Sequence, residues 1–262
     1  MDEGYSKFVS QMKQKLGVDL KLYKETQMKR RLTSLRDKRG YTDFYQYFQA
    51  LDKNKQLFQE LMDRITINVS EFYRNPKRWE VLKNEVLPEL TKVKRKLTVW
   101  SAACSTGEEP YSMALLGAEY FPNIKLHIRA SDIDETVLAK AKQGSYTEQS
   151  LRDLPRHLQN KYFTKQNGLF QIDPQLKQQV TFQKHNLLSD RFPQQVDLII
   201  CRNVLIYFTD QAKEIIYQSF SNALADNGVL FVGSTEQIFS PQKYGLTLQN
   251  TFFYKKEPGL YS

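Results

Sequence analysis

The residues best suited to hold a small ligand lie between two apolar segments near the middle of the chain. The apolar run 97–100 breaks at a turn of small residues, 101–107, and Pro110 then begins an apolar-periodic helix. A second apolar run, 126–130, ends at Asp132. In Rossmann-type sheets such a turn lets the backbone approach a nucleotide-like ligand, and the carboxylate after the second strand accepts hydrogen bonds from ribose hydroxyls.

The same turn lacks the features that bind phosphate groups. It contains one glycine, Gly107, and matches neither GxGxxG nor GxxxxGK[ST]. The expected ligand therefore carries a ribose without a pyrophosphate, which fits S-adenosylmethionine and does not fit NAD or ATP. The alternative is an ordinary α/β domain whose first turn is rich in small residues, because a single strand, turn and helix is a common arrangement.

Polar side chains also recur at the ends of two other predicted strands and at a predicted domain junction. Because open α/β sheets bind ligands at the carboxyl ends of their strands, the joint placement favours one site. Each cluster alone also admits a structural role, and Ser70 could be a helix N-cap. The residues are Asn68, Ser70 and Arg74 in INVSEFYRNPKRW, Asn186 in KHNLLSD, and Arg202, Asn203 and Tyr207 in DLIICRNVLIYF.

The segment that contains Arg202 bears on the kind of group that is modified. Methyltransferases that act on amino groups often carry Asn/Asp-Pro-Pro-Tyr/Phe at this place to hold a neutral nitrogen, and this chain has no such prolines. An arginine there repels a cationic amine and attracts a carboxylate or a phosphate.

Composition limits the broad class of the protein. At 262 residues with 40% hydrophobic and 26% charged residues, the chain has the composition of a soluble globular protein. No apolar run approaches the roughly 18–20 residues of a membrane span, and the N-terminal residues lack the apolar region of a signal peptide. Its two cysteines and three histidines have no metal-ligand spacing. We therefore expect a cytoplasmic protein without a metal.

A net charge of +9 predicts an anionic partner, and eight Lys or Arg residues fall between Lys21 and Arg39. Met28, Leu32 and Leu35 have helical spacing, so one face of this helix is expected to be buried. The opposite face is either a docking surface or simply a solvated face. The cations expected to point outward are Lys29, Arg30, Arg36 and Arg39.

The periodicity divides the chain into an all-α part and an α/β part. Residues 1–75 show only helical periods (5–16, 22–39, 42–51 and 56–67), and 76–95 indicate a linker helix that is interrupted or ends near Pro88. From residue 96 to residue 262 strands and helices alternate, which predicts a parallel sheet. The turn signals within 146–180 predict a small antiparallel insertion. The expected strands are 97–102, 126–130, 180–184, 196–201, 228–233 and 250–255, and the expected helices are 110–121, 134–142 and 210–225.

The motifs together resemble those of chemotaxis receptor methyltransferases of the CheR type, over nearly the whole chain. They are the basic helical domain, ITINVSEFYR, VWSAACSTGEEPYS, SDID, KHNLL, CRNVLIYF, NGVLFVGSTE and the insertion. The resemblance implies a Rossmann-like sheet of the S-adenosylmethionine-dependent methyltransferases with a small antiparallel β insertion, preceded by an all-α N-terminal domain. It also implies methyl transfer to glutamate carboxylates of receptors, with S-adenosylhomocysteine as the product.

The resemblance further assigns roles to residues. Arg74 and Tyr207 correspond to the residues nearest the transferred methyl group, and Ser70 stands where threonine is also found in the family. The basic helix would dock on the cytoplasmic methylation region of a receptor. The cofactor-binding positions are Asn68, Ser70, Arg74, Glu109, Asp132, Asn186, Leu187, Arg202 and Asn203.

The reaction requires no general base from the protein, because a glutamate carboxylate is already ionised at neutral pH. We expect a monomer with no nucleic-acid partner and no direct membrane insertion. The single-glycine turn Asn167-Gly168 argues against strong binding of a receptor tail to the insertion. The alternatives are a nucleic-acid methyltransferase, suggested by the positive charge, and a non-catalytic adaptor that binds S-adenosylmethionine as a signal.

Overall fold

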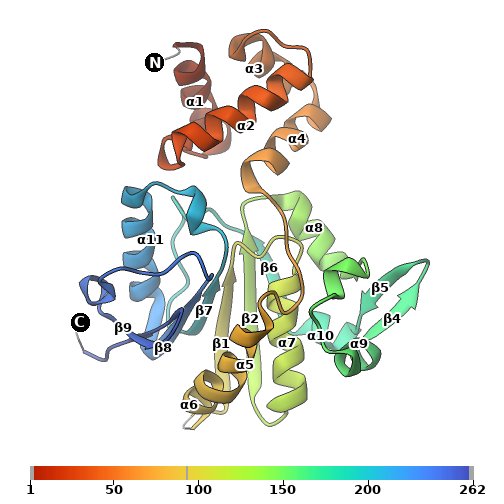
Figure 1. Ribbon diagram of the computed structural model, residues 1–262, viewed down its shortest axis with the longest axis vertical. Coiled ribbons are helices and arrows are strands. Elements are labelled where there is room, and N and C mark those ends of the chain that lie inside the picture. The colour runs from red at the N-terminus through yellow and green to blue at the C-terminus, as the bar shows by residue number, and fades with distance from the viewer. Residues whose placement is uncertain (1–2, 93, 260–262) are drawn as a thin grey trace.

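The computed structural model describes residues 3–92 and 94–259. Residue 93 of the predicted linker helix, and residues 1–2 and 260–262 of the two predicted domains, lie outside the described residues. The chain forms a helical domain, a seven-stranded sheet flanked by helices, and a separate three-stranded sheet (Figure 1). The predicted fold class is therefore confirmed.

The N-terminal domain is built from four described helices, and polar side chains cap the starts of two of them. The side chains of Asp43 and Asn54 accept hydrogen bonds from backbone N–H groups in the first turns of α3 and α4. The predicted helix 22–39 begins later, at Glu25, because a short 3₁₀ turn comes first. The elements are α1 (Glu3–Leu16), η1 (Leu20–Leu22), α2 (Glu25–Lys38), α3 (Phe44–Lys53) and α4 (Lys55–Thr66).

The connecting helix is interrupted where the sequence predicts. It runs as α5 (Pro76–Val81), a π-helical turn η2 (Leu82–Val86) and α6 (Leu87–Thr91). Pro88 has no N–H to donate, so the regular hydrogen-bond ladder cannot continue through it, and the wide turn lies immediately before it.

The large sheet has the strand order β6-β2-β1-β7-β8-β10-β9. Its first five strands pair in parallel, and the last two form an antiparallel hairpin at one edge. The single strand predicted at 250–255 is wrong: it is two strands, because the chain reverses at residues 251–252, where Phe252 has a φ of 73°. The strands are β1 (Lys96–Ala102), β2 (Lys125–Asp132), β6 (Val180–Lys184), β7 (Val196–Cys201), β8 (Leu224–Val232), β9 (Leu246–Asn250) and β10 (Phe253–Lys256).

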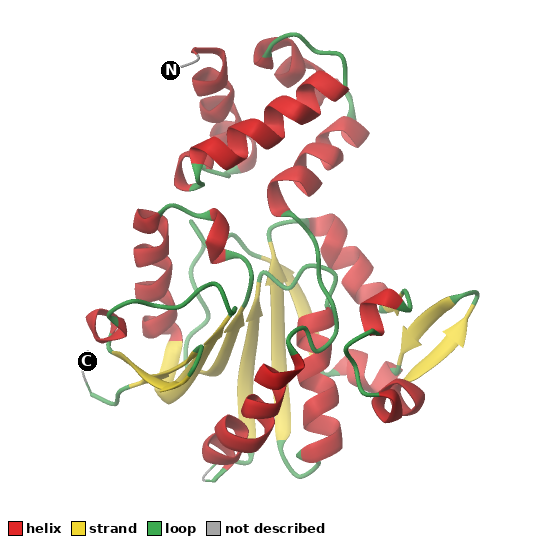
Figure 2. Ribbon diagram, viewed as in Figure 1, coloured by secondary structure: helices red, strands yellow, loops and turns green. Residues whose placement is uncertain are grey.

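Helices cover both faces of this sheet: α7 (Glu108–Tyr120), α8 (Glu135–Gln143) and α11 (Asp210–Ala223). Side chains of β1 alternate between two cores, Leu97 and Val99 on one face and Trp100 and Ala102 on the other. The core around Trp100 continues into the helical domain. Figure 2 shows the central strands pointing toward that domain, which therefore lies over their carboxyl ends.

The insertion is antiparallel, as predicted, but it also contains short helices. Its strands β3 (Ser145–Tyr146), β4 (Phe163–Gln166) and β5 (Leu169–Ile172) pair in the order β3-β5-β4. The tight turn at Asn167-Gly168 has φ values of 51° and 79°, the left-handed conformations that a two-residue hairpin requires. The helical segments are η3 (Gln149–Leu151), α9 (Arg156–Tyr162) and α10 (Pro174–Gln178).

Candidate functional site

A pocket lies where the carboxyl ends of β1, β2 and β7 face the helical domain. It contains about 920 Å³ of space not filled by atoms, part of it open to solvent. The structure brings all ten residues predicted for cofactor binding or catalysis to this one pocket. They are Asn68, Ser70, Arg74, Glu109, Asp132, Asn186, Leu187, Arg202, Asn203 and Tyr207.

The turn after β1 is tied to the carboxylate of Asp132. Asp132 Oδ2 accepts a hydrogen bond from Ser105 N at 2.9 Å, and Oδ1 accepts one from Asp134 N at 3.0 Å. Burial raises the pKa of Asp132 to about 6, although these backbone donors act in the opposite direction. Asp132 also lines the pocket, so its carboxylate is accessible to a ligand there.

Gly107 allows the turn to pass close to the neighbouring helix. Its φ is 94°, and a Cβ at this position would lie 2.9 Å from the Cβ of Ala141. As the N-cap of α7 it starts the helix at Glu108, two residues before the predicted start at Pro110. Pro110 falls in the first turn, where its missing N–H costs no helical hydrogen bond.

Glu109 faces the pocket from the first turn of α7 and accepts a hydrogen bond from Ser101 Oγ at 2.8 Å. Burial raises the pKa of Glu109 to about 7, with the guanidinium of Arg202 acting against that shift. A carboxylate with such a pKa gains its charge at neutral pH when a cation binds beside it.

The junction segment 67–75 adopts a strained backbone that several elements hold in place. Ile67, Tyr73 and Asn75 have φ values of 50°, 52° and 60°. The Tyr73 N–H donates to Ser112 Oγ on α7 at 3.0 Å. The guanidinium of Arg202 donates to the carbonyl of Arg74 at 2.7 Å and to the side chain of Asn75 at 3.0 Å. The N-cap role considered for Ser70 is wrong, because no helix begins there and the next one starts at Pro76.

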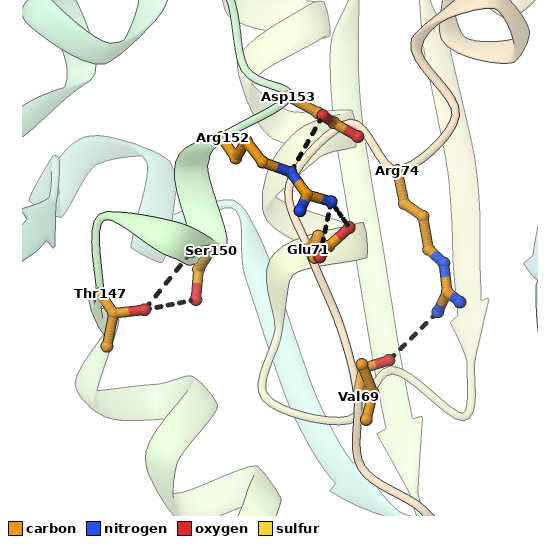
Figure 3. Close-up of polar contacts among 7 residues, drawn as sticks. All are labelled: Val69, Glu71, Arg74, Thr147, Ser150, Arg152 and Asp153. Atoms are coloured by element: carbon orange, nitrogen blue, oxygen red, sulfur yellow. Dashed lines mark hydrogen bonds and ion pairs between the residues drawn. The ribbon is translucent and has the colours of Figure 1, made fainter.

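The insertion holds the same junction from the other side (Figure 3). The guanidinium of Arg152 contacts both carboxylate oxygens of Glu71, at 3.0 and 3.1 Å, and the Phe72 N–H donates to the Ser150 carbonyl at 2.9 Å. The Arg74 side chain extends away from these contacts and donates to the Val69 carbonyl at 3.2 Å.

Asn68 and Asn186 link the helical domain to the sheet. The amide of Asn68 donates to Asp134 Oδ2 at 3.2 Å, and the amide of Asn186 donates to the Gly17 carbonyl at 3.1 Å. Leu187, the next predicted contact, is buried in the core shared with the helical domain and lines the pocket.

Tyr207 lies in the 3₁₀ turn η4 (Leu205–Tyr207), beside the segment of the helical domain that joins η1 to α2. Its carbonyl accepts from Lys24 N at 2.9 Å, while Thr209 N donates to the Leu22 carbonyl at 2.8 Å. The guanidinium of Arg31 lies 5.0 Å from the centre of the Tyr207 ring. The start of α2 is thus joined to the segment that carries Tyr207.

The basic residues of α2 are less uniform than the sequence suggests. The side chain of Arg36 is only 16% exposed: it packs over the Phe44 ring at 4.7 Å and pairs with Asp37, so it does not project freely as predicted. Arg39 is exposed and makes a two-bond contact with Glu60, at 2.6 and 2.8 Å. Lys29 is half buried over the ring of Tyr5, and Arg30 is exposed.

Sequence reasoning did not assign Arg31, His185 or Glu236 to the site. His185 lines the pocket, and burial lowers the pKa of its imidazole. Arg31 and Glu236 adjoin the pocket through long-range contacts that sequence spacing does not reveal. Among the described residues, three buried polar atoms of pocket residues have no hydrogen-bond partner: Ser105 Oγ, His185 Nδ1 and Arg202 Nε.

Two searches of the described residues gave negative results. Within residues 3–92 and 94–259 no helix has the length and apolar character needed to cross a membrane. The same part of the chain shows no cluster of metal-ligating side chains.

A pocket at the carboxyl ends of parallel strands, lined by the buried carboxylate of Asp132, is where open α/β domains bind nucleotide-type ligands, and S-adenosylmethionine-dependent methyltransferase domains have this arrangement. Comparison with protein families agrees: residues 68–253 match the CheR methyltransferase SAM-binding domain, and residues 3–66 match the CheR methyltransferase all-alpha domain. The chain belongs to the CheR methyltransferase family.

Curated relatives extend over the same length. A chemotaxis protein methyltransferase of Listeria monocytogenes is 43% identical over 257 residues, 98% of each chain. That of Borreliella burgdorferi is 36% identical over 85% of this chain and 83% of its own. That of Escherichia coli is 33% identical over 92% of this chain and 86% of its own. The chain is therefore a SAM-dependent methyltransferase of chemotaxis.

Proposed function

We propose that this protein transfers the methyl group of S-adenosylmethionine to glutamate carboxylates of chemotaxis receptors and forms glutamyl methyl esters. The observation that carries the proposal is the set of cations in and beside the pocket. Arg74 lines the pocket with Tyr207, and Arg31 of α2 lies over the Tyr207 ring; we call this part of the pocket its cationic mouth. Guanidinium groups attract a carboxylate as the reacting group, whereas they repel a cationic amine.

The residues of the pocket fit S-adenosylmethionine. Asp132 would accept hydrogen bonds from the ribose hydroxyls, and Glu109 would neutralise a positive charge of the ligand. The unpartnered atoms Ser105 Oγ, His185 Nδ1 and Arg202 Nε would find polar partners on it, which removes the cost of leaving them unpaired. Bound S-adenosylmethionine supplies a methyl group already activated by its sulfonium sulfur.

The protein's contribution to the transfer is alignment and exclusion of water. A glutamate has a reference pKa of about 4.3, so its carboxylate is the nucleophile at neutral pH without a base. Arg74 and Tyr207 would orient it, and correct orientation is worth about 7–11 kcal/mol in favourable cases. An ion pair that held the carboxylate too tightly would stabilise the ground state and slow the transfer.

The basic face of α2 would bring the receptor to this mouth. The methylation region of a receptor presents acidic residues on a helical bundle, so a cationic helix complements it, and Arg30 is exposed on α2. Because Lys24 at the start of α2 bonds to Tyr207, a receptor on this helix lies next to the pocket. We propose that the protein acts as a monomer in the cytoplasm, without a nucleic-acid partner.

The test is transfer of labelled methyl groups to membranes that contain receptors. We expect label in the receptor band, released as methanol by mild base because a glutamyl ester is base-labile. Receptors whose methylated glutamates are replaced by glutamine are the matched control. Base-stable label in nucleic acid would instead support the alternative methyltransferase, and cofactor binding without any transfer would support an adaptor.

A further inference from the structure

Glu236 is buried in the loop after β8, and its carboxylate accepts four backbone hydrogen bonds. Its Oε1 accepts from Val204 N at 2.7 Å and from Leu205 N at 2.6 Å. Its Oε2 accepts from Asn203 N at 2.6 Å and from Gly233 N at 2.8 Å. The side chain is only 4% exposed. A carboxylate can accept about four hydrogen bonds, so these four backbone donors saturate the side chain of Glu236.

Three of these N–H groups belong to the segment that leads to Tyr207. Val204, the N-cap of η4, makes no side-chain cap hydrogen bond, and Asn203 has a left-handed backbone with a φ of 61°. A segment with prolines would have a fixed φ and fewer N–H groups to satisfy. This segment has none between Arg202 and Tyr207, so its N–H groups need an acceptor.

The fit around Glu236 is close enough to require a glycine opposite it. A Cβ added to Gly233 would overlap with Glu236 Oε2 and would lie 2.8 Å from Asn203 N. The motif GSTE therefore contributes both the carboxylate and the space it occupies.

We infer that Glu236 is a positioning residue for methyl transfer, which fixes Asn203 and Tyr207 by holding the backbone between them. The inference rests on the proposed function of the pocket. Glu236 does not line that pocket, whereas Asn203, Val204 and Tyr207 do, so its effect passes through them. Asn203 would contact the cofactor and Tyr207 the substrate carboxylate, and both depend on the same anchored backbone.

The variant Glu236→Gln tests this directly. A glutamine amide retains one acceptor oxygen and places an NH₂ group against backbone donors, so at least one pair of hydrogen bonds is lost. We expect turnover to fall by on the order of 100-fold, the effect of a misplacement of about 1 Å. In hydrogen-exchange mass spectrometry, the peptide 202–208 should exchange faster, while peptides of β1 and α7 should keep wild-type protection.

Asp197→Asn is a matched control for loss of a buried carboxylate. Asp197 is 5% exposed, accepts from Thr98 N at 2.8 Å and pairs with Lys94. It is the second residue of β7, at the end of that strand away from the pocket. We expect this variant to lower the unfolding temperature while the turnover of folded protein and the exchange of peptide 202–208 remain at wild-type values.

Three results would overturn the inference: rapid exchange of residues 203–205 in the wild type, wild-type turnover in folded Glu236→Gln, or equal losses of turnover in both variants. If Glu236→Gln yields no folded protein, Gly233→Ala displaces the same carboxylate and should show the same local exchange and lower turnover. Wild-type turnover in that variant would also refute the role. The exchange measurement needs no methyl transfer, so it separates failure of this inference from failure of the proposed function.

Discussion

At the scale of single residues, two carboxylates face the pocket with raised pKa values, about 6 for Asp132 and about 7 for Glu109. Asp132 holds the turn after β1 through the N–H of Ser105 and the start of α8 through the N–H of Asp134, whereas Glu109 has one hydroxyl donor, Ser101, and a nearby guanidinium. The two groups therefore have different expected roles. Asp132 shapes the site and binds hydroxyls, and Glu109 responds to the charge of the ligand.

Asp132→Ala should weaken binding of S-adenosylmethionine by roughly 10–100-fold, the range for loss of hydrogen bonds to a charged group. Isothermal titration calorimetry measures the affinity, and circular dichroism checks that the fold is retained. Asp226→Ala, at an exposed position of β8, is the control and should bind normally. An unchanged affinity in folded Asp132→Ala would remove the ribose-binding role.

Glu109→Gln should change both stability and binding in a pH-dependent way. The pKa of Glu109 in the folded protein, about 7, exceeds its ordinary value, so its contribution to stability is full below about pH 4.5 and is lost as the pH rises through 7. Glutamine does not titrate, so this variant should unfold at a higher temperature than the wild type at pH 8 and not at pH 5.

Cofactor affinity should show the opposite trend at Glu109. Wild-type affinity should increase between pH 6 and pH 8 as the carboxylate ionises beside the cationic ligand, with proton release on binding at pH 6. Calorimetry in buffers of different ionisation enthalpy measures that proton. The Glu109→Gln variant should bind more weakly and with less dependence on pH. Equal pH dependence in both proteins would exclude Glu109 as the responsive group.

At the scale of elements, α2 has two kinds of basic residue. Arg31 lies over the Tyr207 ring and makes no hydrogen bond or ion pair within the described residues, while Arg30 is exposed on the same helix. Arg36 and Arg39 are already engaged with Asp37 and Glu60. Reversing the last two charges would therefore disturb the helical domain as well as any docking, so Arg30 and Arg31 give the cleaner comparison.

Arg30→Ala and Arg31→Ala should have separable effects on receptor methylation. Arg30→Ala should raise the KM for receptor and weaken the salt dependence, because exposed charges steer association. Arg31→Ala should mainly lower kcat, because it acts beside Tyr207. Steady-state kinetics at two salt concentrations distinguish them, with cofactor affinity unchanged in both. Identical behaviour of the two variants would mean that Arg31 is only a docking charge.

The elements also show which parts of the fold could be predicted. Strand and helix alternation from residue 96 onward predicts the sheet, because buried parallel strands are continuous apolar runs. The sequence pattern did not distinguish β9 from β10, because the chain reverses between them at Thr251 and Phe252, which are not typical turn residues. The ten predicted pocket residues do lie together, but Glu236 and Arg31 reach the site by tertiary contacts that local spacing does not encode.

At the scale of the whole molecule, the helical domain and the sheet share one apolar core and a β-bridge between Tyr23 and Phe208. The pocket also takes residues from both parts, including Tyr23 and Ile65 from the helical domain. Binding of a cofactor should therefore stabilise the two parts together.

Thermal unfolding should accordingly be a single transition. Far-UV circular dichroism and the fluorescence of Trp79 in the connecting helix and Trp100 in β1 should give the same midpoint, and S-adenosylhomocysteine should raise that single midpoint. Two separate transitions, of which only one responds to the ligand, would contradict a shared core.

The most direct test of the account is the chemical identity of the product on the receptor. A receptor's cytoplasmic fragment is incubated with S-adenosylmethionine and either the wild-type protein or Asp132→Ala, digested, and analysed by tandem mass spectrometry. The account predicts one added methyl group on glutamate side chains of the methylation region, removed by mild base, and much less of it with the variant. Methylation confined to lysine, arginine or a terminus, or no methylation by a wild-type protein that binds the cofactor, would contradict it.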